Sequence, residues 1–148
     1  MKKGFTLIEL LAVIVVLAIV ATISIPIVGD VINSGKKEAT ESSTNFYVQE
    51  IEDKFSEWML EGIPTELSYD DSETGYLIFD VQNLNSVLKL EGEKPVSGYV
   101  KVDNDYSDDN SYFGYVISAE LLFENGYVAK YTYNEEASNR SNITVTKK

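Results

Sequence analysis

The sequence predicts an α+β fold in which a long N-terminal α-helix packs against an antiparallel sheet of three or four strands. Three observations indicate this class. Residues 10–29 carry no charge and are mostly apolar, an aromatic or aliphatic residue recurs every four positions between residues 47 and 59, and two β-rich runs flank Asn125-Gly126. At 148 residues the chain has room for one compact domain and an appendage.

The composition argues against several classes of function. The chain has no cysteine and no histidine, so disulfides, zinc fingers, cysteine nucleophiles and histidine general bases are excluded. It has 24 acidic and 12 basic side chains, a net charge of −12, which disfavours binding to the phosphates of nucleic acids. We therefore predict that the chain is not an enzyme and that it does not bind nucleic acid directly.

The uncharged run has the length of a membrane span, about 30 Å for twenty helical residues. Lys2 and Lys3 precede it, and the region from Asp30 onward holds 23 acidic and 10 basic side chains once Glu9 and the two lysines are set aside. The positive-inside rule then places the N-terminus in the cytoplasm and the C-terminus outside.

Three kinds of N-terminal segment contain an apolar run, and they agree with this sequence to different degrees. A cleaved secretory signal has a shorter apolar core, of about 7 to 15 residues. A plain single-pass anchor accommodates Glu9 poorly, because a carboxylate in the hydrocarbon costs roughly 2.5 to 3.5 kcal/mol. The third is indicated by the residues Lys3-Gly4-Phe5-Thr6-Leu7-Ile8-Glu9, which resemble the amino-terminal motif of type IV prepilins and of the related pseudopilins of type II secretion and competence systems.

This resemblance implies a processing and assembly pathway. Residues 1–4 would be a leader peptide that a prepilin peptidase removes after Gly4. Phe5 would become the mature N-terminus and be N-methylated. In the filament, Glu9 would pair with the α-amino group of a neighbouring subunit's Phe5, which offsets the cost of burying the carboxylate and gives assembly a register.

Pro26 also matches a position where many family members carry proline. It cannot donate a helical hydrogen bond to the Thr22 carbonyl, and Gly29 follows three residues later. The alternatives are a tolerated membrane-helix kink and a segment that loses helicity in the filament. We expect the hydroxyls of Thr22 and Ser24 to satisfy part of the freed backbone.

Beyond the apolar run, residues 30–148 are expected to form an extracellular globular domain with a pilin-like fold. An amphipathic helix should continue to about residue 61, with its core stripe at Tyr47, Ile51, Phe55 and Met59, and with Val48 and Trp58 beside it. Asp80 should cap a short helix over residues 81–88. The expected strands are 76–80, 99–102, 115–124, 127–133 and, as an optional last strand, 143–146.

The two strands around Asn125-Gly126 should form a hairpin with a two-residue type I′ turn, in which Phe123 faces Val128. On that register Ile117, Ala119 and Leu121 share the face of Phe123. We expect this face to lie on the stripe of the helix.

An acidic run offers one candidate metal site. Asp103, Asp105, Asp108 and Asp109 fall within seven residues, and calcium prefers several oxygen ligands. The EF-hand spacing fails, because Gly114 stands where its bidentate glutamate should be. We therefore expect a solvated acidic loop and no cofactor, with calcium as the alternative.

The resemblance implies a structural subunit of a type IV pilus that serves adhesion, motility or biofilm formation. Its partners would be other pilin subunits in a homopolymer, with or without minor pilins, the prepilin peptidase and an inner-membrane assembly platform. The chain would be a single-pass membrane protein before assembly and an extracellular filament afterwards. A pseudopilin and a non-polymerising, membrane-anchored adhesion module stay open as alternatives. The absence of cysteine and the single arginine favour a Gram-positive source.

Overall fold

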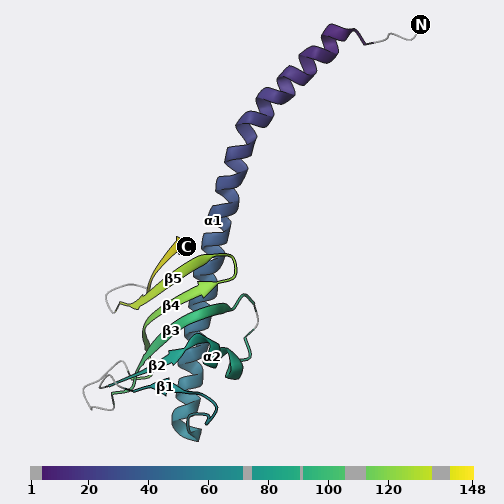
Figure 1. Cartoon of the computed structure of the whole chain (residues 1–148). Helices are drawn as coiled ribbons and strands as arrows, with labels where there is room; N and C mark the ends of the chain where they lie inside the picture. The colour runs from purple at the N-terminus through teal and green to yellow at the C-terminus, as the bar shows by residue number, and fades with distance from the viewer. Residues whose placement is uncertain (1–4, 72–74, 91, 106–112, 135–140) are drawn as a thin grey trace. The chain divides into compact units, whose positions relative to one another are not determined.

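The computed structural model describes residues 5–71, 75–90, 92–105, 113–134 and 141–148. The elements, in chain order, are α1 (Leu7–Glu61), β1 (Tyr69–Asp70), β2 (Tyr76–Asp80), α2 (Val81–Val87), β3 (Pro95–Asp103), β4 (Val116–Phe123), β5 (Tyr127–Tyr133) and β6 (Ser141–Lys147) (Figure 1). The chain divides into two compact units, residues 1–36 and residues 37–148, and each is described by itself.

The second unit is an α+β domain, as predicted. Its six strands form one antiparallel sheet in the order β1-β2-β3-β4-β5-β6, so every strand lies beside its neighbours in sequence. Figure 1 shows this sheet against the last part of α1. The predicted strand number of three or four is too low. The optional last strand is present, and β1, a two-residue strand with exposed side chains, forms only through its pairing with β2.

The core lies between α1 and one face of the sheet. Tyr47, Val48, Ile51, Phe55 and Trp58 are at most 6% exposed, which confirms the predicted stripe except at Met59, which is only partly buried against the core. Alternate residues of the strands cover this stripe, because successive side chains of a strand point to opposite faces. Among them are Leu77, Phe79, Val100, Val102, Leu121, Phe123, Tyr131 and Val145.

The hairpin between β4 and β5 differs from its predicted register by one residue. Leu122, and not Phe123, stands opposite Val128. Gly126 donates its amide hydrogen to the carbonyl of Phe123 at 3.0 Å and has φ 81°, so residues 124–126 form a three-residue loop in place of the predicted two-residue turn. The Asn125 side chain explains the choice, since its oxygen accepts from the Tyr127 amide and its nitrogen donates to Thr40 on α1.

A β-bulge changes which residue of β4 enters the core. Lys101 pairs with Ser118 and Val102 pairs with Val116, so Ile117 is an extra residue without a partner in β3. Val116 is fully buried as a result, and Ile117 is only half-buried. The prediction that Ile117 shares the face of Ala119 and Leu121 is therefore wrong.

Strand β3 begins four residues earlier than predicted, because Gly98 lies inside the strand and does not precede it. Gly98 has φ 130°, and a Cβ there would stand 1.9 Å from the carbonyl oxygen of Glu120 in β4. Only glycine allows the two backbones to approach this closely.

The short helix α2 is capped as predicted. Asp80 accepts a hydrogen bond from the Gln82 amide at 2.7 Å, and Val81, Leu84 and Leu88 are at most 3% exposed. Asn85 links this helix to its surroundings, since its side chain accepts from the Tyr47 hydroxyl and donates to the carbonyl of Pro95.

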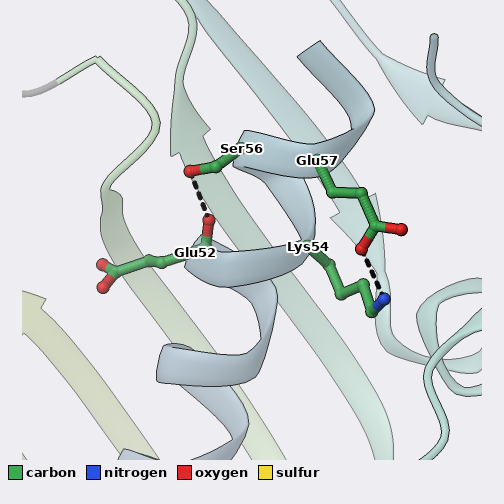
Figure 2. A network of polar contacts seen from close by, with 4 residues as sticks. All are labelled: Glu52, Lys54, Ser56 and Glu57. Atoms are coloured by element: carbon green, nitrogen blue, oxygen red, sulfur yellow. Dashed lines mark hydrogen bonds and ion pairs between the residues drawn. The ribbon is translucent and has the colours of Figure 1, made fainter. Parts of the chain in front are cut away.

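Glu52 fastens α1 to the bulge. Its carboxylate accepts the Val116 amide hydrogen at 2.9 Å, whereas the Lys54–Glu57 ion pair lies on the other side of the helix (Figure 2). Burial raises the pKa of Glu52 above its ordinary value, the bond from Val116 partly opposes this rise, and the nearby Asp53 adds to it. Burial and the Glu52 charge also raise the pKa of the Tyr131 hydroxyl.

Phe55→Ala should lower the free energy of unfolding of the domain by about 3 to 5 kcal/mol, because the ring is fully buried and packs edge-on against Phe113. Phe46→Ala is the matched control on the same helix, since Phe46 is 72% exposed and should change stability by less than about 0.5 kcal/mol. Urea unfolding of a chain without residues 1–29 measures both. Equal losses in the two variants would contradict the assigned core face.

Glu52→Gln should remove a pH dependence of stability. The folded-state pKa of Glu52 lies above the unfolded value of about 4.3, so the folded protein holds the proton more tightly and stability falls as pH rises through this window. The glutamine oxygen can still accept from Val116 without a charge, so the variant should be at least as stable as the parent at pH 7, with a difference that shrinks below pH 4. Urea unfolding across this range measures it, with Glu57→Gln as the exposed control, and identical pH profiles for parent and Glu52→Gln would refute the assignment.

Candidate assembly surface

The first unit presents an uncovered apolar helix. Every residue from Phe5 to Lys36 is exposed, and among them each large aliphatic side chain from Leu7 to Ile32 is at least 49% exposed. By length and composition α1 contains one segment able to cross a membrane. An apolar surface of this extent indicates contact with lipid or with other protein, because its exposure to water is unfavourable in free energy.

The helix begins with a reciprocal pair of hydrogen bonds. Thr6 is the residue before the helix, and its hydroxyl accepts from the Glu9 amide at 3.3 Å. The Glu9 carboxylate accepts in return from the Thr6 amide and from the Thr6 hydroxyl, both at 2.8 Å. This is a capping box, which satisfies two of the backbone donors that a helix N-terminus leaves free.

The capping box gives Glu9 a partner that the sequence analysis missed. A threonine followed three residues later by glutamate, just before an apolar run, is the usual signature of this motif, so the spacing Thr6-x-x-Glu9 could have revealed it. The Thr6 amide persists after cleavage between Gly4 and Phe5, so a processed chain keeps the same bonds. The pairing of Glu9 with Phe5 of a second copy stays a prediction.

Gly4 lies outside the described residues, and Phe5 directly precedes the capping box with 87% of its surface exposed. Cleavage after Gly4 and methylation of Phe5 therefore stay predictions. The exposure of Phe5 agrees with the access that both reactions require.

Pro26 lies inside α1, and the helix continues through Pro26 and Gly29. The hydroxyls of Thr22 and Ser24 donate to the carbonyls of Ala18 and Val20, each at 2.8 Å. The expectation that they satisfy the backbone group freed by Pro26 is wrong, because the Thr22 carbonyl is the one that loses its amide donor and neither hydroxyl reaches it. Loss of helicity at this point in a filament stays a prediction.

The acidic run is only partly described. Asp103 is 6% exposed, and its carboxylate accepts the Asp105 amide at 2.9 Å, which closes a local turn. Asp108 and Asp109 lie outside the described residues. Within the described part of the chain, no group of three or more acidic side chains is placed to hold a metal ion.

Residues 1–25 match the family described as the prokaryotic N-terminal methylation motif. The match includes Gly4, Phe5 and Glu9 and extends to Ile25, one residue before Pro26. Comparison with curated proteins and with solved structures gave no match.

The motif and the fold together define a type IV pilin-like protein, with a prepilin-like leader, a long hydrophobic helix and an α+β domain. The motif implies processing by a prepilin peptidase and assembly of the pilin type. With the hydrophobic helix, it points to a membrane-anchored protein displayed at the cell surface. This class is structural and not enzymatic.

Thr6→Val should loosen the first turn of α1, because it removes the hydroxyl of the capping box and keeps the shape of the side chain. A lost cap costs about 1 kcal/mol, so hydrogen exchange at the Glu9 amide should quicken roughly fivefold in detergent micelles. Thr22→Val is the control, since it removes a hydroxyl that bonds within the helix. Unchanged exchange at Glu9, or equal changes in both variants, would contradict the cap.

Proposed function

We propose that the chain is a structural subunit of a type IV pilus, which serves adhesion, motility or biofilm formation. One observation carries the proposal: the methylation motif of residues 1–25 coincides with the apolar segment of α1, whose described residues are all exposed. A plain membrane anchor accounts for the apolar helix but not for the motif. A polymer of helices accounts for both.

The proposal assigns a role to each part of the chain. Residues 1–4 are a leader that prepilin peptidase removes, and residues 5–29 are the membrane anchor that becomes the filament core. Residues 30–148 are the extracellular domain, and they form the outer surface of the filament. The partners are other copies of the chain, minor pilins and a membrane assembly platform.

The energetics favour a decisive role for Glu9. Transfer of an apolar helix from lipid to a core of similar helices gains little hydrophobic free energy, because lipid tails are as apolar as leucine. A carboxylate is different, since it needs a partner wherever water is excluded. The α-amino group of Phe5 on a second copy supplies a charge of opposite sign, and a separate assembly ATPase would supply the work of extraction.

The experiment that tests the proposal is the intact mass of the chain recovered from sheared cell-surface material. A mass that begins at Phe5, with or without one methyl group, in a high-molecular-weight fraction would support it. A full-length chain found only in membranes would contradict it in favour of a plain anchor. A processed chain confined to membranes would contradict it in favour of a pseudopilin.

Glu9→Ala should leave membrane insertion intact and strongly reduce filament formation, because it removes the carboxylate that pairs with Phe5 of the next copy. Asp30→Ala is the matched control, since it removes a carboxylate from the other end of the apolar run. Membrane fractionation and the yield of sheared filaments measure both steps. Normal filaments from Glu9→Ala would contradict the assembly role assigned to this residue.

A further inference from the structure

The sheet carries a shallow pocket of about 310 Å³ near its β1 edge. The segment before β1, the strands β1, β2 and β3 and the first turn of α2 all contribute to its lining. Phe79 and Val100 are fully buried in the core, so their neighbours Asp80 and Tyr99, which line the pocket, point to the face of the sheet away from α1. The pocket therefore lies outside the core.

Two tyrosines of the lining expose much of their surface. Tyr69 is 43% exposed and Tyr99 is 44% exposed. The Tyr69 ring packs against Phe79, with the two ring centroids 5.8 Å apart, which fixes its position at the sheet edge. Tyr99 stands directly opposite Asp80 in the register of β2 and β3, so a carboxylate lies beside an exposed ring. Aromatic surface next to a few polar groups is typical of ligand sites.

Polar groups complete the wall between α2 and β1. The Asn83 side-chain nitrogen donates to the Ser68 hydroxyl at 2.8 Å, which joins the first turn of α2 to the segment before β1. Asp80 accepts from the Gln82 amide through one of its carboxylate oxygens, so the helix cap holds this acid in place. The pocket thus presents hydroxyl, amide and carboxylate groups in fixed positions around the tyrosine rings.

The charge of the pocket selects the kind of ligand. Asp70 and Asp80 line it, and none of its lining residues, all of which the structure describes, is basic. Lys101 pairs with Ile78 of the lining, but its ammonium group lies toward the other end of β2, 4.2 Å from the centroid of the Tyr76 ring. The two carboxylates repel an anionic ligand, whereas the carboxylates and the tyrosine rings together attract an ammonium group.

We propose that this pocket binds one amino-sugar unit of a polysaccharide, a pyranose ring that carries a protonated amine. The C–H face of the sugar packs on Tyr99, and its hydroxyls bond to Ser68 and Asn83. Its ammonium group lies against Asp70 and Asp80. A volume of about 310 Å³ is near the lower limit of small-molecule sites and suits a single sugar ring. The inference goes beyond the proposed function and applies to one copy of the chain, whether or not it polymerises.

Calorimetric titration of the full-length chain with a tetramer of glucosamine tests the proposal. The chain is kept in a polyoxyethylene detergent, which contains no sugar, at a pH that leaves the amines protonated. We expect saturable binding, and binding of the N-acetylglucosamine tetramer should be at least about tenfold weaker, because acetylation removes the charge. No binding, equal binding of the acetylated tetramer, or equal or tighter binding of tetralysine would overturn the inference.

Paired variants locate the site. Tyr99→Leu and Asp70→Asn should each weaken binding about tenfold without lowering the melting temperature, because both side chains are exposed. Phe46→Leu and Asp53→Asn make similar changes at exposed positions of α1 and should bind as the parent does. Unchanged binding in either pocket variant, or equal losses in the controls, would overturn the inference. The titration needs no filament, so a chain that fails to assemble would defeat the proposed function and leave this result intact.

Discussion

The two parts of α1 need different surroundings to bury their apolar side chains, and the rest of the molecule depends on this constraint. After residue 37, the stripe from Tyr47 to Trp58 is closed off by the chain's own sheet. Before residue 33, the aliphatic side chains stay exposed. Residues 37–148 therefore supply their own core, whereas residues 5–32 need lipid or other copies of the chain to cover them. A protein built in this way is suited to move its apolar segment from a membrane into a filament.

The polar groups of residues 5–32 decide how this segment can pass from lipid into a filament. Lipid and a helical core are similar solvents for leucine, so neither is strongly preferred by the aliphatic side chains. Glu9 is held by Thr6 within its own chain. In the proposed filament its carboxylate would exchange this partner for the amine of a neighbour, so it need not be desolvated without a hydrogen bond at any stage.

Sequence patterns sufficed for those elements whose signal is local. The core stripe of α1 follows from the periodicity of its apolar residues, and the end of α1 at Glu61 follows from the glycine that comes next. The cap of α2 follows from the Asp80 side chain. The register of the β4–β5 hairpin did not, because the Asn125 side chain reaches Thr40, 85 residues away in the chain. The bulge at Ile117 was equally hidden, since it depends on Glu52 of α1 accepting the Val116 amide. Of the candidate assembly surface, the sequence showed Glu9 and the apolar run, but the bonds between Glu9 and Thr6 became evident only in the structure.

The chain closes its C-terminal strand without a disulfide, and the bonds that do so converge on the hairpin loop. Strand β6 pairs along β5 from Ser141 to Lys147, and Val145 enters the core. The Lys148 amide then donates to the Gly126 carbonyl, beside the Asn125 side chain that bonds to Thr40. The last strand is thus tied through one loop to the first turns of the domain's helix. Because these bonds are non-covalent and act together, the Asn125 contact to α1 should add to the pairing with β5 and the burial of Val145 in holding the edge of the sheet.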